Sequence, residues 1–154
     1  MKKDSVHLLL VEDNDADAHL FRVGMSETSS IHSLQVVTDG AMALQYLRRE
    51  GRFSSAPTPD LVLLDLNLPI INGFEVLTAM RGHTELKRIP VVILTSSRAE
   101  RDVNAAYDSG ANAYMQKAAD LDGTMALVKE IENYWIQSAV LPGQVHYLFR
   151  SEPV

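Results

Sequence analysis

The chain has 154 residues, of which 46% are hydrophobic and 22% are charged. This length and balance are typical of one globular domain with a buried core, and they exclude disordered and fibrous classes. Acidic residues outnumber basic ones by 20 to 14, and no long basic run is present, so we expect no binding to nucleic acid. Cysteine is absent, which excludes disulfides and thiolate metal sites.

The first apolar stretch, residues 6–11, predicts a buried strand because it is short, rich in strand-forming residues and followed by four polar residues. It is too short for a signal-peptide core or a membrane span, so we expect a cytoplasmic protein without a membrane segment. Residues 16–25 then show helical spacing, with Asp15 as the candidate N-cap.

Four further strand–helix pairs follow along the chain. Strands are predicted at residues 34–38, 60–65, 91–95 and 113–115, and helices at residues 41–47, 74–80, 99–109 and 121–139. This alternation predicts an α/β fold with right-handed crossovers, in which a doubly wound, five-stranded parallel sheet carries helices on both faces. We assign residues 1–140 to this domain and residues 141–154 to a C-terminal tail, whose apolar residues predict docking on the domain or on a second subunit.

Polar side chains follow four of the five predicted strands. Glu12 and Asp13 follow the first strand, Asp65 ends the third, Thr95 ends the fourth and Lys117 follows the fifth. Because the carboxyl ends of parallel strands meet at one edge of the sheet, we expect these side chains to lie together.

Three carboxylates at one edge repel one another, and a hard divalent cation with oxygen ligands relieves that repulsion. We therefore expect Mg²⁺ at this edge. Asp13 and Asp65 are the expected direct ligands, Glu12 is expected to bind directly or through water, and the backbone carbonyl of Asn67 completes the set.

A carboxylate in such a site can also attack phosphorus and form an aspartyl phosphate. Asp65 has the central position for this role. Thr95 and Lys117 would then bind the phosphoryl oxygens, since phosphoryl transfer depends mainly on neutralising charge.

With these residues in place, the sequence resembles the receiver domain of two-component response regulators over about residues 6–138. The matching segments are residues 11–14, 39–40, 43–44, 63–69, 90–96 and 110–114, with Gly73 and Lys117. The resemblance implies a flavodoxin-like sheet of strand order 2-1-3-4-5. It also implies a signalling module, not an enzyme, that accepts a phosphoryl group on Asp65 from a histidine kinase or a histidine phosphotransfer protein.

The resemblance further implies that Thr95 and Tyr114 switch together on phosphorylation and change a protein-interaction surface. For Tyr114, ordinary packing is the alternative. Asn67 and Ser97 flank the phosphorylated carboxylate, and we expect them to influence the lifetime of the acyl phosphate.

Within the family, the chain is similar to stand-alone receivers that work with phytochrome-type kinases. The similarity lies in the link at residues 54–59, the stretch 86–90, and the ending 134–135 followed by 141–142. One departure is Ala118, since most receivers place proline after the lysine that Lys117 matches. We expect a trans bond at 117–118, or a strained cis bond held by the fold.

Two other functional classes share parts of this pattern. A phosphohydrolase of the haloacid dehalogenase type also uses an aspartate nucleophile with Mg²⁺, but its second acid stands where this chain has Asn67. A flavodoxin-like cofactor binder would need phosphate-binding loops of Gly, Ser and Thr, and the acid pair Glu12-Asp13 argues against it.

The last predicted helix is apolar on more than one side. Leu127, Tyr134 and Ile136 lie off the stripe that contains Val128, Ile131 and Trp135. Such a surplus predicts a partner surface, and we expect a homodimer through this helix and residues 145–149. The alternative is that the tail folds back over the helix.

Overall fold

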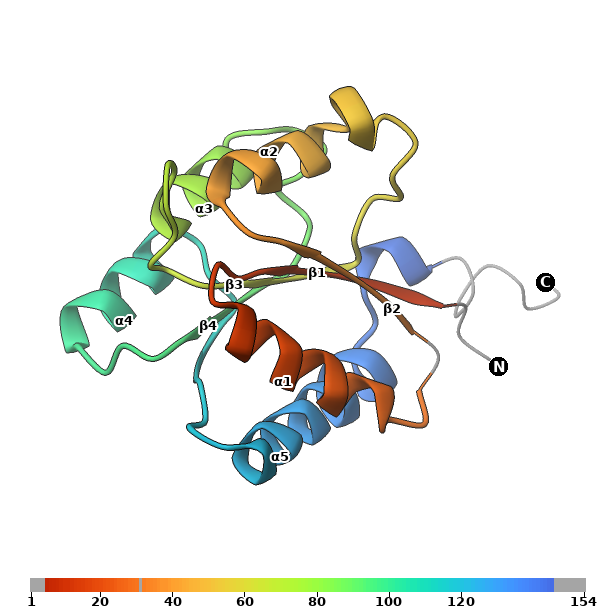
Figure 1. Ribbon diagram of the computed structural model, residues 1–154. Coiled ribbons are helices and arrows are strands. Elements are labelled where there is room, and N and C mark those ends of the chain that lie inside the picture. The colour runs from red at the N-terminus through yellow and green to blue at the C-terminus, as the bar shows by residue number, and fades with distance from the viewer. Residues whose placement is uncertain (1–4, 31, 146–154) are drawn as a thin grey trace, which may run out of the picture.

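The computed structural model describes residues 5–30 and 32–145 and contains a five-stranded parallel sheet with helices on both faces (Figure 1). The main elements are β1 (Val6–Val11), α1 (Asp15–Ser26), β2 (His32–Val37), α2 (Gly40–Arg48), β3 (Leu61–Leu64), α3 (Gly73–Arg81), β4 (Val91–Thr95), α4 (Glu100–Asp108), β5 (Ala113–Gln116) and α5 (Leu121–Ile131). The strand order β2-β1-β3-β4-β5 confirms the predicted fold class and topology. Within the described residues, no helix is long and apolar enough to cross a membrane.

The sheet separates two apolar cores. Helices α1 and α5 cover one face, and α2, α3 and α4 cover the other (Figure 1). Alternate residues of a strand point to opposite faces, so Leu8 and Leu10 of β1 pack toward α1 and α5, whereas Leu9 and Val11 pack on the other side. Strands β3 and β4 are buried along their whole length, which explains why their sequences are continuously apolar.

Side-chain caps mark the starts of α1 and α3 at the carboxyl edge of the sheet. The Oδ1 atom of Asn14 accepts a hydrogen bond from the backbone N–H of Asp17 at 3.0 Å and caps α1. Asp15 is instead the first helical residue, so the prediction of Asp15 as the cap was wrong by one position. Asn72 and Glu75 form a capping box at the start of α3.

The last helix changes its geometry at Glu132. From Glu132 to Ser138 the chain continues α5 as a π-helix, which has more residues per turn than an α-helix. The wider turn places Ile136 in the core, five residues after Ile131, while Trp135 is only partly buried. The prediction that Ile136 belongs to a partner surface was therefore wrong. Trp135 packs against the core, as predicted, but stays partly exposed, and Tyr134 is 59% exposed.

Residues 141–144 lie at the amino edge of the sheet. Leu141 is buried in the core shared with α1 and α5. Gln144 is also buried, and its Nε2 donates to Oδ2 of Asp60 at 3.3 Å, an oxygen that also accepts the backbone N–H of His7 at 2.9 Å. The beginning of the predicted tail thus packs on the domain, and residues 146–149 of the predicted dimer arm lie outside the described residues.

Candidate functional site

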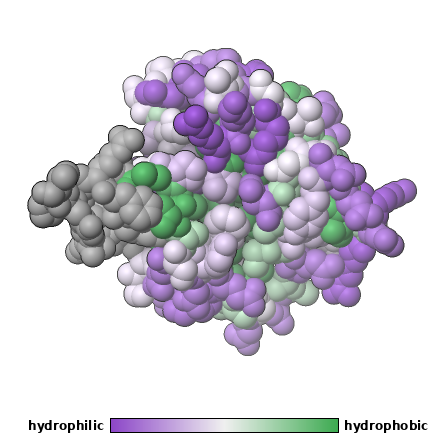
Figure 2. All heavy atoms as spheres, turned by 180° about the vertical axis from the view of Figure 1, so that it is seen from behind, coloured by the Kyte–Doolittle hydropathy of each residue, from purple (hydrophilic) through white to green (hydrophobic). Residues whose placement is uncertain are grey.

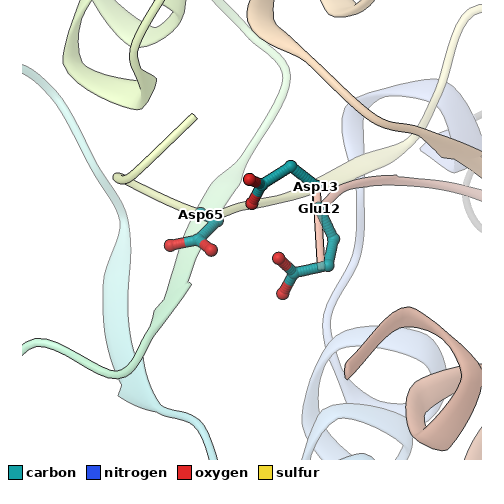
Figure 3. A group of neighbouring side chains, drawn as sticks. All are labelled: Glu12, Asp13 and Asp65. Atoms are coloured by element: carbon teal, nitrogen blue, oxygen red, sulfur yellow. The ribbon is translucent and has the colours of Figure 1, made fainter. Parts of the chain in front are cut away.

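Three carboxylates meet at the carboxyl edge of the sheet. Glu12 and Asp13 follow β1, Asp65 follows β3, and their side chains point into a common space (Figure 3). The two strands are neighbours, and Val11 pairs with Leu64, so the next residues along each strand are brought side by side. One oxygen from each carboxylate lies within 4.8 Å of the others. Such a set of hard oxygen donors suits a divalent cation.

The ammonium group of Lys117 lies against the same carboxylates. Its Nζ is 2.5 Å from Oε1 of Glu12, 2.8 Å from Oδ2 of Asp65 and 3.0 Å from Oδ2 of Asp17. The backbone N–H of Lys117 donates to the carbonyl of Thr95 at 2.9 Å, which ties the end of β5 to β4. Lys117 therefore uses one N–H for each carboxylate.

Burial dominates the electrostatics of this cluster. The pKa of Glu12 is raised to about 7: burial raises it most, the hydrogen bond from Lys117 lowers it, and the nearby charge of Asp65 raises it again. Burial alone lowers the pKa of Lys117, but its hydrogen bonds to Asp65, Glu12 and Asp17 outweigh burial and keep that pKa above its ordinary value. The lysine is thus a permanent cation at the site.

The loop between β3 and α3 supports the carboxylate of Asp65. The backbone N–H of Asn67 donates to Oδ1 of Asp65 at 3.3 Å, and the N–H of Gly73 donates to the carbonyl of Leu66 at 3.0 Å. A Cβ atom at position 73 would collide with the carbonyl oxygen of Asp65, so this close approach requires glycine.

An open cavity of about 650 Å³ lies over these groups. Its lining includes Asp13, Asp17, Asp65, Asn67, Ser96 and Lys117. Asp65 is buried at 5% exposure but lines the cavity, so its carboxylate is reached from solvent through this opening.

Thr95 and Tyr114 are linked through the loop that follows β4. Thr95 is fully buried, and its Oγ1 accepts the N–H of Ser97 at 3.5 Å. The hydroxyl of Tyr114 donates to the carbonyl of Ser97 at 3.0 Å. The hydroxyl of Ser97 donates to Asp102 of α4 at 2.6 Å, and Ser96, instead of Ser97, lines the cavity.

The structure brings together most of the residues that the sequence analysis selected. Glu12, Asp13, Asp65 and Lys117 share one cluster. The peptide bond at 117–118 is trans, as are the other bonds of residues 5–30 and 32–145. Sequence reasoning missed Asp17 as a partner of Lys117, although its position four residues after Asp13, in the first turn of α1, places it at this edge.

Comparison with known proteins decides the family. The model of the response regulator receiver domain matches residues 8–129. The chain belongs to this family. Response regulator Rcp1 of Synechocystis sp. is 40% identical over 135 residues, which cover 88% of this chain and 92% of Rcp1. The probable methanogenesis regulatory protein FilR2 of Methanothrix harundinacea is 37% identical over 142 residues, covering 92% of this chain and 90% of FilR2.

Solved structures of response regulators agree with the observed fold. The phosphorylated cyanobacterial phytochrome response regulator RcpA is 42% identical with a TM-score of 0.86, covering 90% of this chain and 99% of RcpA. The Mn²⁺-bound form of Rcp1 is 39% identical with a TM-score of 0.84, covering 89% of this chain and 99% of Rcp1. The chain is thus a response regulator receiver, a signalling module that works with histidine kinases, which favours this class over a haloacid dehalogenase-type phosphohydrolase.

Proposed function

We propose that this response regulator receiver accepts a phosphoryl group on Asp65 from a histidine kinase of the phytochrome type, directly or through a histidine phosphotransfer protein, in the cytoplasm. The observation that carries the proposal is the position of the Asp65 carboxylate beside the open cavity, where it contacts the Lys117 ammonium at 2.8 Å. The similarity to RcpA, a phytochrome response regulator, supports this type of kinase.

The donor set fits Mg²⁺. Glu12, Asp13 and Asp65 supply hard oxygen atoms within 4.8 Å of one another, and Asn67 follows in the loop that borders the cavity. We assign the three carboxylates and the backbone carbonyl of Asn67 to the cation, and the Mn²⁺-bound form of Rcp1 supports a divalent ion. The bound ion supplies positive charge to the phosphoryl oxygens.

The chain's own groups then act on the phosphoryl group in defined ways. An oxygen of Asp65 attacks phosphorus, and the bond from phosphorus to the donor atom breaks, with the electron pair leaving on the donor. Lys117 stays protonated and binds one phosphoryl oxygen, since its pKa is held above the ordinary value. The hydroxyl of Thr95 binds another oxygen.

Phosphorylation is proposed to act outward through Thr95 and Tyr114. When the Thr95 hydroxyl turns toward the phosphoryl group, it loses its hydrogen bond from the backbone N–H of Ser97. The carbonyl of the same Ser97 accepts the hydroxyl of Tyr114, so the change reaches Tyr114. The loop before α4 and the side chain of Tyr114 then shift together, and the surface formed by α4, β5 and α5 changes. The output is a population shift between two protein-binding states.

The homodimer proposed for this chain uses α5, its π-helical continuation and the tail. Tyr134 and Val140 are exposed at 59% and 46%, and Tyr134 packs edge-on against Trp135 at 4.9 Å between ring centroids. Seen from behind, the surface is mostly hydrophilic; the largest strongly hydrophobic area lies at one end of this face, and smaller ones lie at the opposite end and the upper edge (Figure 2). Light scattering that gives a monomer mass both before and after phosphorylation would contradict the dimer.

Intact mass spectrometry tests the phosphoacceptor. The chain is incubated with acetyl phosphate and Mg²⁺, with parallel samples of Asp65→Asn, of wild type with a chelator, and of Asp108→Asn as a control at an exposed acid of α4. We expect a gain of one phosphoryl group in wild type and Asp108→Asn, and no gain in the other two samples. Phosphorylation of Asp65→Asn to the wild-type extent would refute the assignment.

A further inference from the structure

Lys117 has a third carboxylate partner outside the group of three acids. Asp17 lies in the first turn of α1, and its Oδ2 is 3.0 Å from the Nζ of Lys117. It contacts Lys117 from the helix layer, whereas Glu12 and Asp65 contact Lys117 from the ends of sheet strands. The side chain of Lys117 is only 13% exposed, so this contact is partly shielded from water.

The three partners of Lys117 differ in what happens to them during phosphorylation. Asp65 loses its carboxylate charge when one of its oxygens becomes bonded to phosphorus. Glu12 belongs to the set of three grouped acids that suits a divalent cation, and Asp17 does not. Asp17 is therefore the partner that keeps its negative charge for Lys117, because it is not in the group that suits the cation and does not become bonded to phosphorus.

We propose that Asp17 is a positioning residue that holds the ammonium of Lys117 at the edge of the cavity while Glu12 and Asp65 are withdrawn from it. Two N–H groups of Lys117 are then free to face the phosphoryl group. Lys117 remains protonated throughout, and the electron pair of the broken phosphorus–oxygen bond leaves with acetate when acetyl phosphate is the donor. The inference rests on the proposed function, since it concerns the phosphorylation of Asp65.

The chain offers a matched control for this contact. Asp15 lies in the same first turn of α1, but among the described residues the ion pairs of Lys117 are with Glu12, Asp17 and Asp65. Asp17→Asn and Asp15→Asn therefore remove the same charge from the same helix end, and only the first removes an ion pair with Lys117. The cap of α1 uses the backbone N–H of Asp17, so both variants keep it.

The test measures the initial phosphorylation rate against acetyl phosphate concentration at saturating Mg²⁺. We expect Asp17→Asn to lower the maximal rate about fivefold and to change the half-saturating concentration less than about twofold, as the loss of one partly exposed ion pair predicts. Asp15 also lines the cavity but forms no ion pair with Lys117 among the described residues, so Asp15→Asn is expected to lower the maximal rate clearly less than Asp17→Asn does. Asp17→Glu, which keeps a carboxylate, is expected to recover most of the maximal rate.

Urea unfolding of each variant checks that the fold is retained. Equal maximal rates for Asp17→Asn and Asp15→Asn would overturn the inference, and so would Asp17→Glu being as slow as Asp17→Asn. A wild-type chain that is never phosphorylated would overturn the proposed function and this inference with it. A phosphorylated wild type with an unaffected Asp17→Asn overturns only the inference.

Discussion

Glu12 is expected to make the stability of the chain depend on pH in an unusual direction. Its pKa rises from the ordinary value of 4.5 to about 7 in the folded chain, chiefly because the carboxyl group is buried. The folded chain therefore binds the proton more tightly than the unfolded chain does. The stabilising contribution of protonated Glu12 is complete below pH 4.5 and is lost as the pH rises through about 7.

The magnitude follows from the two pKa values. Between about pH 5 and about pH 8, this group alone lowers the free energy of unfolding by about 2.5 kcal/mol. Glu12→Gln carries no titrating group at position 12 and loses this dependence. The stability of the variant relative to wild type should thus increase by about 2.5 kcal/mol as the pH rises across this range.

The assay is urea unfolding of wild type and Glu12→Gln, followed by Trp135 fluorescence in the presence of a chelator that removes divalent ions. The chelator is essential because a cation that binds the folded carboxylates would lower the apparent pKa of Glu12. A difference in unfolding free energy that stays constant across the pH range would refute the reasoning.

Three further changes test the packing of the chain. Ile70 is 79% exposed and has a φ of 69°, so Ile70→Gly is expected to be about 1 kcal/mol more stable than Ile70→Ala in thermal unfolding. Glu132 is fully buried, which by itself would raise its pKa, but hydrogen bonds from Lys129 and Ser30 lower that pKa. Glu132→Ala should therefore cost about 2 kcal/mol near pH 7 and less in acid, measured by urea unfolding. Leu141→Ala should cost about 3 kcal/mol by the same measurement, and Val140→Ala, at an exposed position, much less.

The sequence predicted the sheet and the central acids well because both depend on short-range patterns. A continuously apolar run such as residues 61–64 has few alternatives to a strand buried on both faces. The parallel topology then brings the strand ends together, so Glu12, Asp13, Asp65 and Lys117 meet whatever the details of the loops.

Features that depend on long-range contacts could not be predicted from the sequence. The π-helix at Glu132–Ser138 contacts Ser30, which lies more than 100 residues earlier: the carboxylate of Glu132 accepts the backbone N–H of Ser30, and Nε2 of Gln137 donates to the hydroxyl of Ser30. No local pattern signals this pairing, so an ideal helical period placed Ile136 outside the core. The role of Asp17 was missed for a similar reason, since an acid in a first helical turn is already explained by the helix dipole.

The site combines four carboxylates with one ammonium, so three negative charges stay uncompensated when every acid is ionised. The pKa of Glu12 is raised to about 7, and Lys117 contacts three of the acids at once. A divalent cation held by Glu12, Asp13 and Asp65 would therefore compete with Lys117 for Glu12 and Asp65. Asp17, on α1, is outside the group of three acids, so under the proposed inference it keeps Lys117 close during that competition.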